Sequence, residues 1–215
     1  MLIIQLENIH EFLLGENKKM DNIQIAEQVE KFLSEQYSKI IELDTGSNGG
    51  KIRDISGKIT ETLTEMIWNL LAEKYPTIKA EICVGETRPY KIIDNEGNYI
   101  EESVDRHCYI NDKLVLAIEC KTYLDKCYMQ RADGDFNLMK SYNKDFDGII
   151  ISIENSIADN SYNFFMNRKN IDKVYYLAIG KRNSAKLKKI CYHQERIQRD
   201  LIMTLINDME KYFII

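Results

Sequence analysis

The chain has 215 residues, of which 44% are hydrophobic, and a formal net charge of −5. These values fit one globular domain that buries a sizeable core. No apolar run approaches the roughly 18 residues of a membrane span, and the first residues lack the basic flank of a signal peptide. The five cysteines form no CxxC pair and there are only three histidines, which argues against disulfides and a zinc site. We therefore expect a cytoplasmic protein with no membrane segment and with reduced thiols.

The amino-terminal part differs in character from the rest of the chain. Residues 1–45 carry an amphipathic helical pattern, with Ile25, Val29 and Leu33 on one side, and predict a helical appendage packed on a main domain at 46–215. Residues 45–53, rich in Gly, Ser and Asn, predict a flexible loop. This loop is either a linker between the two parts or a phosphate-binding segment. In the second case Lys51, Arg53 and Lys58 contact DNA.

The elements of the main domain follow one another in a recognisable order. Apolar periodicity predicts a helix over 55–74, and β-rich runs predict strands over 78–84, 103–110 and 114–121. Further along the chain, the same criteria give a helix over 128–142, a strand over 148–153, a helix over 162–167 and a strand over 174–179. The run Gly148–Ile153 is uniformly apolar, which is typical of a central strand covered on both faces. The order predicts an α/β fold with a mixed central β-sheet flanked by helices.

The two strands at 103–121 form a predicted hairpin that brings two acids together. A three-residue loop at 111–113 places Ile110 opposite Leu114 and therefore Asp105 opposite Glu119, with Cβ atoms roughly 5 Å apart. Two ionised carboxylates at this distance repel one another unless a cation lies between them. The hairpin therefore predicts a site for a divalent metal ion.

The residues after Glu119 extend this site. Side chains alternate along a strand, so Lys121 shares a face with Glu119 while Cys120 points into the core. An ammonium there stabilises charge on a phosphate or activates water. The alternative is a solvated strand end with an ordinary Glu and Lys.

With this spacing the chain resembles the PD-(D/E)xK nuclease superfamily, and within it the type II restriction endonucleases. Asp105 matches the first acid, following Val104 where the family name has proline, and Glu119-Cys120-Lys121 matches the (D/E)xK tripeptide. The resemblance covers roughly residues 55–180 and implies an αβββαβ core. It also implies Mg²⁺, with Mn²⁺ as a substitute, bound by Asp105, Glu119 and the backbone carbonyl of Cys120. Catalysis then falls to Asp105, Glu119 and Lys121.

In this family a glutamate on the first helix often points into the active site. Glu61 is the best match here and Glu65, one turn later on the same helix face, is the alternative. Both lie roughly opposite the apolar stripe of their helix, so an ordinary solvated face would also explain them.

Candidate DNA contacts come from two segments. The run 122–131 resembles the sequence after the catalytic lysine in several restriction endonucleases, and Lys126, Gln130 and Arg131 are candidate phosphate or base contacts. Residues 168–199 contain ten Lys or Arg and two acids, which predicts a basic surface for phosphates that includes Lys186, Lys188 and Lys189. A solvated helix rich in Lys is the alternative.

The leading hypothesis is an Mg²⁺-dependent, sequence-specific endonuclease that cuts double-stranded DNA. A homodimer would let two sites cut the two strands of a palindrome, and a heteromeric subunit is a variant. The alternatives are a repair or recombination nuclease of the same fold and a non-catalytic DNA-binding module. The target sequence, the cut position and the overhang are not encoded in any recognisable pattern.

Overall fold

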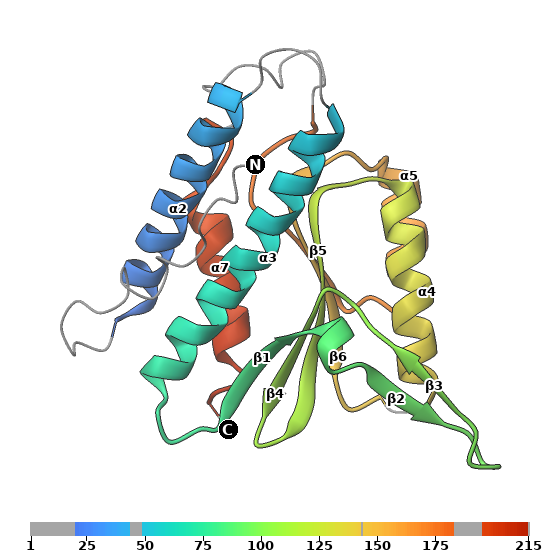
Figure 1. Ribbon diagram of the computed structural model, residues 1–215. Coiled ribbons are helices and arrows are strands. Elements are labelled where there is room, and N and C mark those ends of the chain that lie inside the picture. Colours follow the sequence, from blue (N-terminus) through green and yellow to red (C-terminus); the bar gives the residue numbers. More distant parts are fainter. Residues whose placement is uncertain (1–19, 44–48, 143, 183–194, 215) are drawn as a thin grey trace.

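The computed structural model describes residues 20–43, 49–142, 144–182 and 195–214, without the side chains of 37–43, 49–56 and 142 (Figure 1). Its helices are α2 (Asn22–Leu43), α3 (Gly49–Lys74), η2 (Gly85–Thr87), α4 (Lys126–Tyr142), α5 (Asp159–Met166) and α7 (Arg199–Glu210). Its strands are β1 (Ala80–Val84), β2 (Tyr90–Ile93), β3 (Tyr99–Glu102), β4 (Arg106–Ile110), β5 (Lys113–Leu124), β6 (Asp147–Asn155) and β7 (Lys173–Tyr176).

A five-stranded mixed sheet with the order β1-β4-β5-β6-β7 forms the centre of the molecule. The pairs β1–β4 and β4–β5 are antiparallel, whereas β5–β6 and β6–β7 are parallel. The order α3, β1, β4, β5, α4, β6 is the predicted αβββαβ core, and α5 and β7 extend it. The predicted fold class is therefore confirmed, including the apolar β6 buried between two neighbouring strands.

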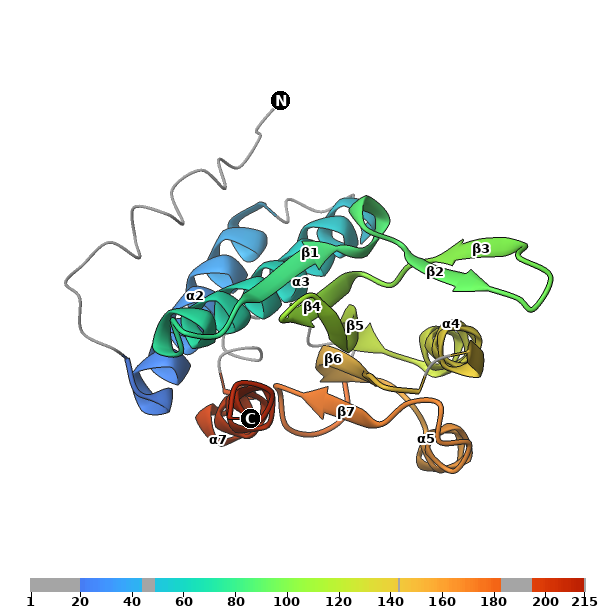
Figure 2. The same ribbon diagram turned by 90° about the horizontal axis from the view of Figure 1, so that it is seen from below.

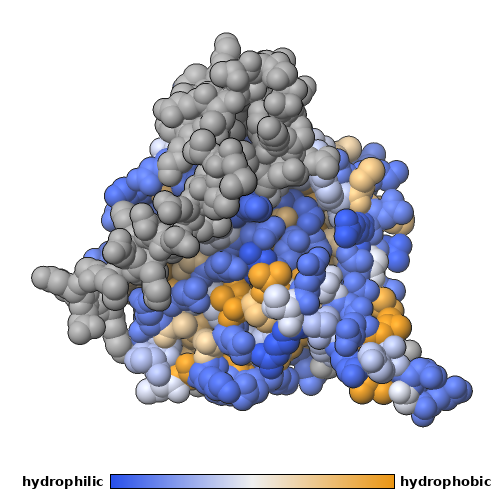
Figure 3. Space-filling view, viewed as in Figure 1, coloured by the Kyte–Doolittle hydropathy of each residue, from blue (hydrophilic) through white to orange (hydrophobic). Residues whose placement is uncertain are grey.

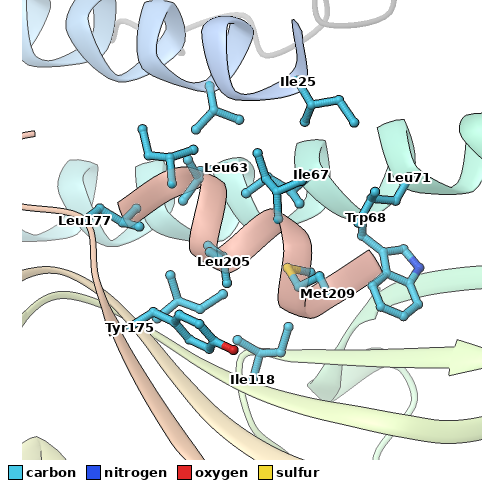
Figure 4. Packing of buried hydrophobic residues seen from close by; sticks show 14 of the residues in the cluster. Ile25, Leu63, Ile67, Trp68, Leu71, Ile118, Tyr175, Leu177, Leu205 and Met209 are labelled. Carbon is cyan, nitrogen blue, oxygen red and sulfur yellow. The ribbon is translucent and has the colours of Figure 1, made fainter. Parts of the chain in front are cut away.

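Helices cover both faces of this sheet (Figure 2). On one face α2, α3 and α7 share a core with sheet residues such as Ile118, and Figure 4 shows Trp68, Leu205 and Met209 within it. On the other face α4 and α5 enclose a second core that contains Phe136 and Ile150. The two layers fix α3 on one side of β5 and α4 on the other, and so set the walls of any site at the end of β5.

The helix α2 is part of the first core. Its apolar residues Ile25, Val29 and Leu33 are fully buried there, together with residues of α3 and α7. Arg199 of α7 also forms ion pairs with two glutamates of α2. The division of the chain at residue 45 stays a prediction.

Three features of the fold differ from the expectations. Helix α3 begins at Gly49, so the loop predicted through Arg53 is wrong over 49–53, and Lys51 and Arg53 lie on a helix. Helix α7 and the β2–β3 hairpin were not expected. The signals for α7 were present, since Ile202, Leu205, Ile206 and Met209 recur at helical spacing and are buried.

The β2–β3 hairpin projects from the body (Figures 1 and 2). Asp94 organises its turn by accepting hydrogen bonds from the backbone N–H groups of Glu96 and Asn98, both at 2.9 Å. Figure 3 shows a largely hydrophilic face with some apolar surface near the base of this hairpin.

The turn of the β4–β5 hairpin also differs from the expectation. Its turn has two residues rather than three, because Asn111 and Asp112 both adopt positive φ, at 50° and 64°, as a type I′ turn requires. Ile110 therefore pairs with Lys113 and Tyr109 with Leu114. A β-bulge then leaves one extra residue on β5, so that Arg106 pairs with Ile118. This restores, at the far end, the register expected for the two acids.

The remaining global expectations concern cysteines and membranes. Cys83, Cys108, Cys120 and Cys127 are free thiols, and Cys191 lies outside the described residues. Within the described ranges, no helix combines the length and apolar character needed to cross a bilayer.

Candidate active site

Asp105, Glu119 and Lys121 meet at the end of the β4–β5 hairpin. The ammonium of Lys121 lies 2.9 Å from Oδ2 of Asp105 and also contacts the Glu119 carboxylate. Glu119 is 5% exposed, whereas the side chain of Asp105 is 29% exposed. The structure therefore brings the three predicted residues together, with a cation already placed between the two acids.

The strand backbone and the core hold this group in position. The backbone N–H of Cys120 donates to Oδ2 of Asp105 at 2.7 Å, which fixes the carboxylate on β5. The Cys120 side chain points the other way, as predicted, and lies 3.5 Å from the Thr64 hydroxyl in the core. Helix α3 is tied to the same strand, because the Thr60 hydroxyl donates to the Lys121 carbonyl at 3.3 Å.

Arg106 links the two candidate helix glutamates to this site. Its buried guanidinium lies 2.9 Å from Oε2 of Glu61 and 2.7 Å from Oε1 of Glu65. It also donates a hydrogen bond to the carbonyl of Asp105 at 2.6 Å. The two glutamates are therefore partly exposed, with side chains 30% and 37% exposed, and paired with β4 through Arg106.

A pocket of about 400 Å³ opens where α3, β5 and α4 meet. It is lined by Gly57, Lys58, Glu61, Asp105, Cys120, Lys121, Thr122, Tyr123 and Tyr128. Glu61 lines the pocket whereas Glu65 does not, which favours Glu61 as the carboxylate that faces a ligand. Both tyrosines form an aromatic wall, with ring centroids 5.6 Å apart.

The electrostatics of the site follow from burial and mutual repulsion. Burial is the largest effect on Glu119 and raises the pKa of its carboxyl to about 7, although the Lys121 ammonium acts in the opposite direction. Burial also raises the pKa of Glu61. For Lys121, burial alone lowers the pKa, but Glu119 and Asp105 outweigh it and hold the pKa above its usual range. Burial therefore favours the protonated form of Glu119, while the two acids favour the charged form of Lys121.

The donor set fits a magnesium ion that relies on few protein ligands. In the described part of the chain, no three His, Cys, Asp or Glu side chains form a metal-binding group. However, Mg²⁺ keeps several waters and commonly takes only one or two carboxylates together with substrate phosphates. The ion-paired cluster holds four carboxylates and two basic groups, so its formal charge is −2. Asp105 and Glu119 fit such an ion, with Lys121 as its competitor.

The remaining predicted contacts fall into three groups. Lys58 lines the pocket, and Lys126, Gln130 and Arg131 are exposed on the first turns of α4. The side chains of Lys51 and Arg53 lie outside the described part, although their backbone is helical. The residues Lys186, Lys188 and Lys189 also lie outside it.

Several described basic residues of 168–199 are paired with acids from elsewhere in the chain. Arg168 pairs with Asp133, Lys173 with Asp208 and Lys181 with Asp159. Arg199 pairs with both Glu27 and Glu30. These described residues therefore present less positive charge to a partner than their number in the sequence suggests.

Four residues near the site were not predicted. Arg106 follows Asp105 directly, and a basic residue beside a catalytic acid was the available signal. Tyr123 and Tyr128 belong to the run 122–131, from which only Lys126, Gln130 and Arg131 were predicted to be contacts. Asp135 on α4 gave no signal, and burial, followed by the nearby Glu102 carboxylate, raises the pKa of its side chain.

Comparisons with known proteins give separate information about the class of this protein. No family model matches the sequence. The type II restriction enzyme DdeI of Desulfomicrobium norvegicum is 29% identical over 139 residues, which cover 55% of this chain and 58% of the relative. The chain thus spans just over half the length of this curated relative. The similarity supports a restriction-type nuclease, while membership of the PD-(D/E)xK superfamily stays a prediction.

Proposed function

We propose that this protein is an Mg²⁺-dependent, sequence-specific endonuclease that hydrolyses phosphodiester bonds in double-stranded DNA. The observation that carries the proposal is the convergence of Asp105 and Glu119 on the Lys121 ammonium at the end of β5, where Asp105 and Lys121 line a pocket. The similarity to a type II restriction enzyme supports the same reaction class. A homodimer would supply two such sites to the two strands of a palindrome.

The chemistry assigns a separate role to each side chain. Asp105 and Glu119, with the Cys120 carbonyl, would hold the Mg²⁺ ion. When bound, the ion supplies Lewis-acid stabilisation of negative charge on the phosphate. Lys121 places its ammonium beside the same phosphate, where it stabilises the charge that grows during attack and orients the attacking water. Glu61 faces the pocket from α3 and accepts a hydrogen bond from that water.

The substrate contacts are proposed from exposure and position. Lys58 lies at the pocket and suits a phosphate next to the scissile one. Lys126, Gln130 and Arg131 are exposed on α4, where arginine and glutamine suit bidentate recognition of base edges. Lys51, Arg53 and the Lys186, Lys188 and Lys189 group complete the proposed phosphate contacts.

Incubation of the purified protein with plasmid or phage DNA and Mg²⁺ tests the proposal. Discrete bands support a sequence-specific endonuclease, and Mn²⁺ in place of Mg²⁺ should also support cleavage. A smear would favour a repair or recombination nuclease instead. DNA binding without cleavage, and without metal binding at Asp105 and Glu119, would favour a non-catalytic module.

A further inference from the structure

A second cluster of buried charge lies beside the candidate active site, at the end of β6. Glu154 is 3% exposed, and its carboxylate forms ion pairs with two guanidinium groups. Oε1 lies 2.7 Å from Nη1 of Arg196, and Oε2 lies 3.2 Å from Nε of Arg182. Glu154 thus joins two basic side chains at the end of β6.

Arg196 is the structural member of this pair. Its side chain is 10% exposed. Besides Glu154, it donates hydrogen bonds to the carbonyls of Ile179 at 2.9 Å and Gly180 at 3.0 Å. Arg196 therefore links the segment after β7 to β6. These contacts leave its guanidinium unavailable to a ligand.

Arg182 is placed differently. Its side chain is 26% exposed, and its guanidinium carbon lies 4.1 Å from the ring centroid of Tyr123. Tyr123 lines the pocket and is paired with Glu154 in the β5–β6 register. The backbone N–H of Arg182 donates to the Asn155 carbonyl at 2.7 Å. Arg182 is thus fixed beside the pocket wall by its backbone, its acid partner and an aromatic face.

Among the described basic residues of 168–199 that form ion pairs, Arg182 is the one that lies over the ring of a residue lining the pocket. Arg199 pairs with two carboxylates, Glu27 and Glu30, which compensate its positive charge. Lys173 pairs with Asp208, which Lys211 also contacts, and Lys181 pairs with Asp159. Arg182 therefore places a guanidinium next to the acidic cluster, which would repel a polyanion unless cations accompany it.

We propose that Arg182 is a phosphate-binding residue, contacting a DNA backbone phosphate adjacent to the one that lies at Lys121. This inference rests on the proposed function and deepens it. A guanidinium held by Glu154 at one edge and by Tyr123 on one face is preorganised, so it loses little side-chain freedom when a phosphate binds its exposed edge. The Glu154–Arg196 pair supports it from the core and does not touch the DNA.

The test measures binding of the full chain to a labelled DNA duplex of arbitrary sequence, with Ca²⁺ present, over a series of salt concentrations. Loss of one phosphate contact should reduce the slope of log affinity against log salt by about 1. Arg182→Gln should show this loss together with a severalfold weaker affinity. Arg199→Gln is the matched control and should leave the slope unchanged.

Arg182→Lys separates the phosphate contact from support of the fold. It keeps the charge beside Glu154 and should keep the slope, while its affinity falls because an ammonium cannot bind bidentately. A wild-type slope in folded Arg182→Gln would overturn the inference and leave the proposed nuclease intact. Equal losses in the Arg182 and Arg199 variants would overturn it too. A wild-type protein that binds no DNA would remove both the inference and the proposed function.

Discussion

Glu119 and Glu154 are two buried glutamates on neighbouring parallel strands with different surroundings. Glu154 is 3% exposed and is matched by two guanidiniums, Arg182 and Arg196. Glu119 is 5% exposed and meets one ammonium, that of Lys121, which it shares with Asp105. Glu154 therefore pairs with two basic groups, whereas Glu119 shares a single basic group with a second acid.

This difference separates a structural from a chemical use of buried charge. A buried carboxylate that is fully paired contributes to the fold, because removal of one partner leaves an uncompensated charge. A buried carboxylate that shares one cation with a second acid has a raised pKa, mainly because of its burial and then because of the second acid, and its ionised form needs further positive charge. Only the second kind shares its cation with a residue that lines the pocket, Asp105, and this supports the proposed site at the end of β5.

The largest expected effect is on stability and concerns Glu154, the glutamate with two basic partners. Glu154→Gln leaves two guanidiniums without their carboxylate and should lower the free energy of unfolding by about 3 to 5 kcal/mol. Urea unfolding followed by circular dichroism measures it. Glu119→Gln is the control and should cost much less, because Lys121 keeps Asp105 as a partner. Equal losses would erase the distinction between the two glutamates.

The next largest expected effect is on DNA cleavage and concerns Glu119 and its two neighbours in the site. Asp105→Ala, Glu119→Ala and Lys121→Ala should each reduce the rate of DNA cleavage by at least about 10²-fold, the usual order for a lost electrostatic stabiliser. Far-ultraviolet circular dichroism should show an intact fold in each variant. If any two of the three cut DNA at nearly the wild-type rate, the assigned site is wrong.

A pH dependence follows from the raised pKa of Glu119. Its carboxyl, with a pKa of about 7, must lose its proton before it binds a metal ion, so protons and metal compete for it. Affinity for Mn²⁺ or Ca²⁺ should therefore be full above pH 7 and fall by about tenfold for each pH unit below it. Calorimetric titration across this range measures the effect. A flat profile between pH 5 and pH 8 would contradict the raised pKa.

The sequence predicts much of this arrangement because the relevant signals are local. Strand alternation places Glu119 and Lys121 together and turns Cys120 inward, as the structure confirms. The hairpin register is a less direct success. The loop was predicted one residue too long, and the bulge on β5 supplies that residue, so the two acids meet as expected.

The remainder depends on partners far away in the sequence. The basic segment 168–199 pairs with Glu27, Asp133, Glu154 and Asp208, and no local pattern indicates these pairs. Likewise the periodicity of α3 shows Glu61 and Glu65 opposite the apolar stripe, but it does not show that Arg106 lies in front of them. Long-range pairing decides which charges remain for a ligand.

The smallest expected effect distinguishes the two helix glutamates. Both pair with Arg106, but only Glu61 lines the pocket, and burial raises the pKa of its carboxyl. Glu61→Gln should weaken Mn²⁺ affinity or slow cleavage by about tenfold, as outer ligands of metal sites commonly do. Glu65→Gln is the matched control, and its effect on both quantities should be small because its carboxylate serves only Arg106.

Calorimetry with Mn²⁺ and single-turnover cleavage, applied to both variants, separate the possible results. A larger loss in Glu65→Gln would reverse the assignment and place the helix carboxylate one turn later on α3. Equal small losses would mean that Arg106 alone needs these acids, and that neither takes part in the chemistry. In that case the chemistry would depend on Asp105, Glu119 and Lys121 alone. Helix α3 would only position Thr60 and Lys58 beside them.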